Sequence, residues 1–160
     1  MNITDELVAR VARTRPVPEG QAQPRLGVAV VACMDSRINP VEIFGLRGGD
    51  AHVIRNAGGL VTDDVIRSLA VSQHRLGTRA VMVIQHADCG MQKVTEEEFA
   101  EQVAAHAGSA PSWAVGAFRD VEASVRRSVQ RLVDCPFLLA RDEIRGFVFD
   151  ESNGDLREVH

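Results

Sequence analysis

Five side chains that could do chemistry stand in two short stretches of this sequence. The first stretch, VACMDSRINP, carries Cys33, Asp35 and Arg37 directly after an apolar run. The second, HADCG, carries His86 and Cys89, also directly after an apolar run. A thiol, a carboxylate and a guanidinium are each costly to bury without partners, so their crowding here indicates a functional site. Two thiolates and one imidazole form a zinc-binding set, and the sequence therefore predicts that Cys33, His86 and Cys89 hold Zn2+.

The apolar runs before these stretches are the elements that must position the side chains. Residues 26–32 and 80–85 are short and rich in valine, as strands buried on both faces are. Residues 51–57 form a third strand, and a helix from Thr62 to Gly77 follows it. Strand, helix and strand in this order predict parallel pairing. Because ligands gather at the carboxyl ends of parallel strands, the three metal-binding side chains meet if the strands at 26–32 and 80–85 are neighbours.

Two further helices and an N-terminal arm are also predicted. Thr95 and Glu98 form a capping box, which is typical of a helix start. Apolar residues at helical spacing, Phe118 included, predict a long amphipathic helix over residues 115–133. Residues 1–25 combine a short amphipathic helix with a proline-rich segment.

A C-terminal hairpin completes the predicted sheet. Residues 144–150 and 155–159 read as strands joined by a Ser-Asn-Gly turn. The expected fold class is therefore α/β, with a mostly parallel central sheet of four strands, an antiparallel edge strand and helices on both faces. We expect residues 26–160 to form a single zinc-binding catalytic domain and residues 1–25 to form a helical arm.

Composition and charge argue against several other classes of protein. The chain has 160 residues and a formal net charge of -4, and its acidic and basic residues are intermixed, so no basic stripe indicates nucleic-acid binding. No apolar run approaches the roughly 18 residues that span a bilayer, so no membrane association is expected. Acidic residues near the start of the chain and an odd number of cysteines lead us to expect a cytoplasmic protein.

The fourth position of the zinc site decides whether the site is closed or open. Cys135 follows a long helix and is expected to be an ordinary packed residue, so it does not supply the missing ligand. The fourth position is then either Asp35 or water. Arg37 can hold the Asp35 carboxylate with two parallel hydrogen bonds, which would keep that carboxylate beside the metal rather than on it.

Taken together, the two stretches resemble the motifs of the β-class carbonic anhydrases, in their compact bacterial form. The resemblance extends from about residue 26 to the C-terminus and is weaker after residue 100. It is carried by three segments of the sequence: Cys33-x-Asp35-x-Arg37, His86-x-x-Cys89-Gly90, and the glycine loop RNAGG at 55–59.

The resemblance implies a reaction and a role for each residue of the site. The implied reaction is the reversible hydration of carbon dioxide to bicarbonate and a proton by a zinc-bound hydroxide. The implied role of Asp35 is to accept a hydrogen bond from that hydroxide, and Arg37 anchors Asp35. Backbone N–H groups near Gly58 and Gly59 are implied to face the substrate.

Two alternative functions remain open on the sequence alone. Relatives of the compact form hydrolyse carbonyl sulfide or carbon disulfide with the same zinc set, so the resemblance also allows that activity. A non-catalytic zinc or redox-sensing module is the other alternative, although a restrained carboxylate has no purpose there. The chain contains no tyrosine, so the wall of the substrate pocket must come from residues such as Phe44, Leu46 or Val61, or from a second subunit.

The oligomeric state follows from the same resemblance. The family is built on dimers in which the N-terminal helix reaches across to the other subunit, and residues 1–25 fit that arrangement. We therefore expect a homodimer or a dimer of dimers. The expected partner besides a second copy is the small-molecule substrate, CO2 or bicarbonate.

Overall fold

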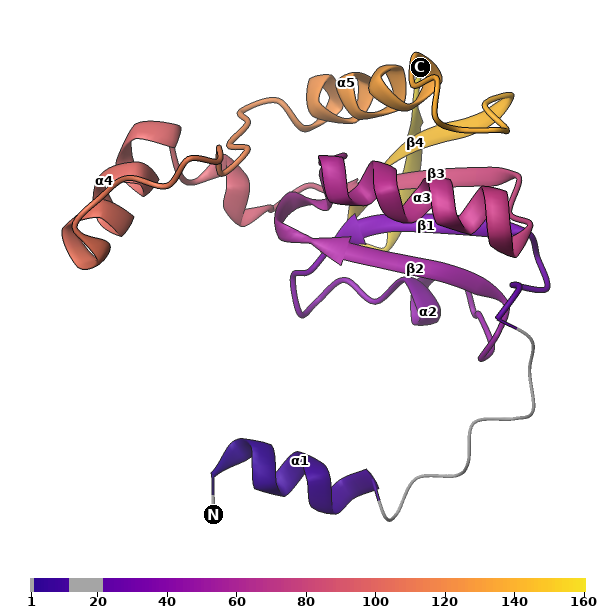
Figure 1. Cartoon of the computed structure of the whole chain (residues 1–160), viewed down its shortest axis with the longest axis horizontal. Helices are drawn as coiled ribbons and strands as arrows, with labels where there is room; N and C mark the ends of the chain where they lie inside the picture. The colour runs from indigo at the N-terminus through magenta and orange to yellow at the C-terminus, as the bar shows by residue number, and fades with distance from the viewer. Residues whose placement is uncertain (1, 12–21) are drawn as a thin grey trace.

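A single five-stranded sheet organises the chain in the computed structural model, which describes residues 2–11 and 22–160 (Figure 1). The strands are β1 Val28–Cys33, β2 Ala51–Asn56, β3 Ala80–His86, β4 Glu143–Asp150 and β5 Asp155–Val159. Their order across the sheet is β2-β1-β3-β4-β5. The first four are parallel, and β5 pairs antiparallel with β4 at one edge. The predicted fold class is confirmed.

Helices cover both faces of this sheet, though unequally. The helices are α1 Ile3–Val11, α2 Pro40–Ile43, α3 Asp63–Leu76, α4 Glu96–Ala107 and α5 Val121–Val133. Figure 1 shows α3 and α5 over one face, with the short α2 on the other. Thr62 caps α3 by accepting from the backbone N–H of Val65, and Gly77 ends this helix in the left-handed conformation that glycine adopts without strain.

The core is divided by the sheet because successive side chains of a strand point to opposite faces. Ala29 and Val31 of β1 pack with Leu69 of α3 and Leu132 of α5 on one side. Val30 packs with residues near α2 on the other side. Full burial of such aliphatic side chains stabilises the fold by roughly 1.5–3 kcal/mol each, which explains why β1 and the first five residues of β3 are apolar. Cys135 lies in the α3/α5 core, as an ordinary packed residue would.

The helix predicted over 115–133 is wrong at its start, since α5 begins only at Val121. Gly116 has a φ of 81°, which breaks helical geometry, and Asp120 caps the first turn by accepting from the backbone N–H of Ala123 at 3.1 Å. Phe118 is therefore a loop residue and does not belong to the apolar stripe of the helix. The loop carries Phe118 to the carboxyl edge of the sheet, where it packs with Cys33 and Cys89.

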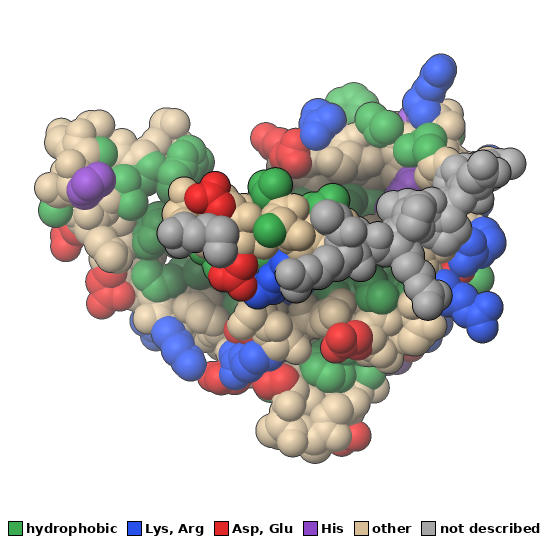
Figure 2. Space-filling model, turned by 90° about the horizontal axis from the view of Figure 1, so that it is seen from below, with side chains coloured by type: hydrophobic (Ala, Val, Ile, Leu, Met, Phe, Trp, Pro, Cys, Tyr) green, Lys and Arg blue, Asp and Glu red, His purple; other side chains and the backbone are tan. Residues whose placement is uncertain are grey.

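Two helices have no buried residue of their own. Neither α1 nor α4 contains one, and Figure 1 shows both extending away from the sheet. The proline-rich segment predicted after α1 falls largely on residues 12–21, which lie outside the described residues. Acidic and basic side chains are intermixed on the face seen from below in Figure 2. Within the described ranges, no helix has the length and hydropathy needed to cross a membrane.

Candidate metal centre

The carboxyl ends of β1 and β3 bring the predicted metal ligands together. β1 and β3 are hydrogen-bonded neighbours, with Ala32 opposite Ile84, so the condition for the ligands to meet is fulfilled. Cys33 is the last residue of β1, and His86 is the last residue of β3. Cys89 lies in the turn that follows β3, directly before the short 3-10 turn Gly90–Gln92. Parallel strands end at the same edge of a sheet, so the three side chains face one another.

The geometry of this cluster suits a zinc ion. The ligand atoms of Cys33, His86 and Cys89 all lie within 4.8 Å of one another, and all three residues are buried. The two sulfurs are 3.9 Å apart, close to the about 3.8 Å expected for two sulfurs on a tetrahedral zinc with Zn–S near 2.3 Å. The Nε2 atom of His86 is buried and has no hydrogen-bond partner, which is costly unless a metal takes its lone pair. The residues present therefore fit zinc.

The two thiols ionise very differently because they share one proton. The hydrogen bond with the Cys89 thiol is the main reason why the pKa of Cys33 falls to about 4, and the backbone N–H groups of Asp35 and Gly58 contribute. The same contact with Cys33, together with burial, raises the pKa of Cys89. One thiolate therefore forms easily, whereas the second needs a cation beside it. A dithiolate metal site stabilised in this way should release a proton when it binds its metal.

The carboxylate beside the cluster is held in place by Arg37. The guanidinium donates from Nε to Oδ1 of Asp35 at 3.0 Å and from Nη2 to Oδ2 at 2.8 Å. These side-chain hydrogen bonds hold the pKa of Asp35 well below its usual range, so this residue is a carboxylate at neutral pH. Its Oδ2 atom lies 3.9 Å from His86 Nε2, on the border of the cluster. The bidentate pair expected from the sequence is thus formed.

Arg37 is itself held by the loop that carries Cys89. Its Nη1 atom donates to the Asp88 carboxylate at 3.0 Å, and its Nη2 atom donates to the Asp88 carbonyl at 2.9 Å. Lys93 makes a further ion pair with Asp88 at 2.8 Å. The guanidinium therefore links the loop after β1 to the loop after β3, and this link restricts the movement of Asp35.

Arg55 shapes the loop that follows β1. This side chain extends from β2 and donates to the carbonyl of Cys33 at 3.0 Å and to the carbonyl of Asp35 at 2.7 Å. Cys33 is the last residue of β1 and Asp35 lies beyond the strand, so a side-chain donor satisfies carbonyls at the point where the sheet ends. The result is a fixed spacing between the thiol and the carboxylate.

The glycine loop lies against the cluster in two different ways. Gly58 has a φ of 85° and borders the small hollow at the cluster. Gly59 has a φ of 62°, and a Cβ there would lie 2.8 Å from both the backbone N of Cys33 and the carbonyl of Ile84. Only glycine allows the loop to approach β1 and β3 this closely. Gly58 therefore faces the opening, and Gly59 packs behind it.

The hollow at the cluster is small and mostly apolar. The hollow has a volume of about 190 Å³ and is lined by Cys33, Met34, Asp35, Ala57, Gly58, Cys89, Gly90 and Met91. The residues predicted to form this wall lie elsewhere, because Phe44 packs against the core near α2 and Val61 packs in the core near α3. Within the described residues, Met34 and Met91 provide the apolar wall instead.

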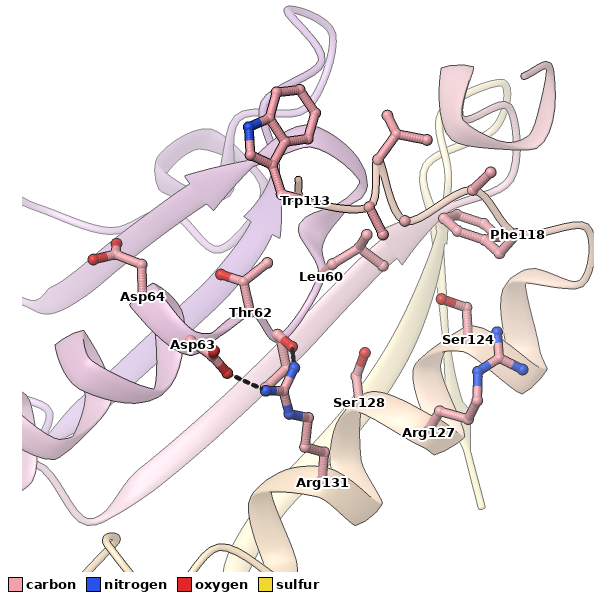
Figure 3. A pocket seen from close by; sticks show the side chains of 15 residues that line it. Leu60, Thr62, Asp63, Asp64, Trp113, Phe118, Ser124, Arg127, Ser128 and Arg131 are labelled. Carbon is pink, nitrogen blue, oxygen red and sulfur yellow. Dashed lines mark hydrogen bonds and ion pairs between the residues drawn. The ribbon is translucent and has the colours of Figure 1, made fainter. Parts of the chain in front are cut away.

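A larger groove of about 690 Å³ lies between the start of α3 and α5 (Figure 3). Leu60, Trp113 and Phe118 line it together with Arg127 and Arg131. Phe118 also packs against the two metal-site cysteines, so its ring belongs both to the wall of the groove and to the surroundings of the cluster. The groove itself holds none of the metal-binding side chains.

Sequence reasoning did not identify four residues that complete this site. Asp88 and Arg55 stand inside the motifs that were recognised, so their positions could have drawn attention to them. Phe118 falls in a segment for which the sequence predicts a helix. Glu151 had no sequence signal at all, yet its Oε1 atom lies 2.9 Å from Nδ1 of His86, 65 residues away in the chain.

Comparisons with known proteins agree with this geometry. A sequence profile of the family described as carbonic anhydrase matches residues 28–156. The β-carbonic anhydrase 1 of Mycobacterium tuberculosis is 45% identical over 136 residues, which cover 85% of this chain and 83% of that protein. The crystal structure of the carbonic anhydrase from Streptococcus mutans matches with a TM-score of 0.89 and 39% identity, covering 100% of this chain and 99% of that one.

A relative with a different name also matches at lower identity. A carbon disulfide hydrolase of Acidithiobacillus thiooxidans is 32% identical over 152 residues, which cover 82% of this chain and 76% of that protein. The fold, the Cys-His-Cys cluster and these matches together define a zinc enzyme of the α/β type. The chain belongs to the carbonic anhydrase family, in its β class.

Proposed function

We propose that this protein catalyses the reversible hydration of carbon dioxide to bicarbonate and a proton at the cluster of Cys33, His86 and Cys89. The observation that supports it most directly is the buried, unpartnered Nε2 of His86 facing two thiols, with a restrained carboxylate at its border. A bound zinc ion supplies a nucleophile at neutral pH by lowering the pKa of a water molecule.

We propose that Asp35 acts on the attacking water directly and that Arg37 acts through Asp35. Asp35 is ionised and can only accept hydrogen bonds. It therefore orients the attacking water by accepting a hydrogen bond from its O–H group. Arg37 offsets the negative charge of Asp35 and holds it off the metal position. In a closed state Asp35 itself would be the fourth ligand, so the Asp–Arg pair acts as the gate of the site.

The small hollow supports a small, uncharged substrate. The wall formed by Met34 and Met91 favours a linear apolar molecule over a charged one. We propose that the backbone around Gly58 and Gly59 faces the substrate oxygen, with Gly58 at the border of the hollow. Gly59 would act through its packing behind that border.

Hydrolysis of carbonyl sulfide or carbon disulfide is the alternative, and the relative from Acidithiobacillus thiooxidans favours keeping it. Two assays on the purified zinc-loaded protein separate the possibilities. Stopped-flow measurement of CO2-driven acidification should show fast turnover, and release of hydrogen sulfide from either sulfur compound should be slow. Slow CO2 hydration together with fast release of hydrogen sulfide would show that the sulfur compound, and not CO2, is the substrate. One zinc per chain with neither activity would favour a non-catalytic module.

We also propose that the protein works as a homodimer, or a dimer of dimers, with residues 1–25 as the dimerisation arm. The apolar side chains of Ile3, Leu7 and Val8 are 63%, 50% and 71% exposed, which a second copy would bury. The groove in Figure 3 offers apolar and basic side chains as a surface for such a contact. A reducing compartment such as the cytoplasm would keep Cys33 and Cys89 available as thiolates.

A further inference from the structure

Glu151 lies beside the metal centre although it comes from the far end of the chain. The last residue of β3, His86, is in register with Phe149 of β4, and the pairing continues with a hydrogen bond from Ala87 N–H to the Phe149 carbonyl at 3.0 Å. Two residues beyond Phe149, at the start of the hairpin turn, Glu151 turns back toward β3. Its side chain is only 11% exposed, which is unusual for a carboxylate.

One oxygen of Glu151 receives two hydrogen bonds from the loop that carries the metal ligands. Its Oε1 atom lies 2.9 Å from Nδ1 of His86 and accepts the backbone N–H of Asp88 at 3.0 Å. An oxygen that accepts a backbone N–H and also faces a ring nitrogen is placed as an acceptor for both. The proton of the neutral imidazole is therefore on Nδ1, since a carboxylate oxygen cannot donate.

The tautomer of His86 determines which of its nitrogens can bind a metal. With the proton on Nδ1, the lone pair is on Nε2, and Nε2 is the nitrogen that lies buried among the two cysteine sulfurs. The opposite tautomer would direct an N–H at the place where the cation binds. A carboxylate behind a metal-binding histidine fixes both the tautomer and the ring orientation.

We propose that Glu151 is the positioning residue of this metal centre: it fixes His86 in the Nδ1–H tautomer and holds the His86-x-x-Cys89 loop through the N–H of Asp88. The same Oε1 atom lies 3.6 Å from Nη2 of Arg37. Glu151 is thereby in contact with the metal ligand and with the anchor of Asp35 at once. It does not touch the substrate, so its role is exerted through these two residues.

The inference rests on the proposed zinc ligands, and zinc affinity tests it without reference to catalysis. The dissociation constant for zinc is measured by competition with a chromophoric chelator in wild type, Glu151→Gln and Glu151→Ala. Loss of such a supporting carboxylate weakens metal binding by about 10–100-fold, which we expect for Glu151→Ala. Glu151→Gln keeps the shape and one acceptor but loses the charge, so we expect a measurable loss of several-fold, up to about tenfold.

A second measurement reports on the tautomer itself. Nitrogen-15 NMR of histidine-labelled, metal-free protein should show His86 as a single Nδ1–H tautomer in wild type and as a mixture of both tautomers in Glu151→Ala. Glu158→Gln is the matched control, because Glu158 also pairs with an arginine, Arg145, on a neighbouring strand but does not contact the cluster. It should leave both measurements unchanged.

Each outcome supports or overturns the proposal. If Glu151→Ala does not fold, the zinc affinity of the isosteric Glu151→Gln variant is the measurement that supports or overturns the role of Glu151. A Glu151→Gln protein with the zinc affinity of wild type, together with an unaltered His86 tautomer in any folded variant, overturns the role of Glu151. A wild-type protein that binds no zinc would instead overturn the proposed metal site, so the two failures are distinguishable.

Discussion

The carboxyl edge of the sheet and the two extending helices differ in where their side chains find partners. At the edge, Cys33, His86 and Cys89 are buried by the chain's own strands and loops. In α1 and α4 no residue is buried, although both helices are capped at their N-terminal ends. Asn2 accepts a hydrogen bond from the N–H of Asp5, and α4 starts with the Thr95 capping box. Local signals are therefore enough to form a helix. Burial by the same chain is what forms a site.

This difference has a consequence for how each region can be disrupted. The edge depends on contacts between segments far apart in the sequence, so single substitutions there should act on metal binding and catalysis. Helix α1 depends on local hydrogen bonds and on a surface that a second copy would supply, and α4 depends on its capping box and on the hydrogen bonds that Glu96 accepts from the loop at 115–117. Substitutions there should act on assembly and on stability, and they should leave the metal cluster in place.

Removal of one sulfur should have the largest effect. Cys89→Ser replaces a thiolate with a poor zinc ligand, so the purified protein should lose its zinc and its CO2 hydration rate should fall by roughly a thousandfold or more. Metal analysis and stopped-flow assays measure both. Cys135→Ser is the matched control, since this third cysteine is also buried but packs in the α3/α5 core. Equal zinc content in the two variants would contradict the ligand assignment.

Loss of the carboxylate anchor should have the next largest effect. Arg37→Ala frees Asp35 to move toward the metal position, and displacement of a reacting group by about 1 Å can lower a rate by roughly a hundredfold. We expect zinc to be retained while the CO2 hydration rate falls by about that factor. Arg145→Ala removes a similar bidentate pair with Glu158 away from the site and should keep the rate. Full activity of the Arg37 variant would rule out the gate.

A charge on the apolar side of α1 should weaken assembly without affecting the edge. Burial of a leucine side chain stabilises an interface by roughly 1.5–3 kcal/mol, so Leu7→Asp should weaken the dimer by about tenfold or more in sedimentation velocity experiments. Ala9→Asp introduces the same charge on the other side of the helix and is the control. The zinc content should be unchanged in both. If both variants dimerise as wild type does, α1 does not contribute to the interface.

The smallest effect should come from the link between α4 and the loop that carries Phe118. The Glu96 carboxylate accepts from the backbone N–H groups of Val115, Gly116 and Ala117 at 2.8, 2.7 and 2.9 Å. Glu96→Gln should lower the melting temperature by about 4 °C at neutral pH. Glu97→Gln, at an exposed position beside it, should have almost no effect.

The stabilising effect of Glu96 should depend on pH. Hydrogen bonds from the loop, first of all from the N–H of Ala117, lower the pKa of Glu96 in the folded protein. Its stabilising contribution is therefore fully present above the unfolded pKa of about 4.3 and is lost as the pH falls through the lower folded pKa. The gap in melting temperature between wild type and Glu96→Gln should be widest near pH 7 and narrow in acid. A gap that widens in acid would contradict this assignment.

Much of the fold was predictable because it follows from local patterns. The valine-rich runs predicted β1 and β3, and Thr62 and Gly77 marked the ends of α3 because capping depends only on neighbouring backbone groups. The same reasoning failed for residues 115–120. There the apolar residues have helical spacing, but Gly116 breaks the helix. The Glu96 carboxylate, which is distant in sequence, also holds this segment as a loop by accepting hydrogen bonds from its backbone N–H groups.

The sequence by itself determined the ligand types, the strands that carry them and the pairing of Asp35 with Arg37, because each is written in residues a few positions apart. Only the tertiary structure decided that Glu151 lies behind His86, that Arg37 also binds Asp88, and that Met34 and Met91 border the opening. These contacts depend on which strands pair and in which register. No local pattern encodes that choice, since it is set by the burial of the whole sheet.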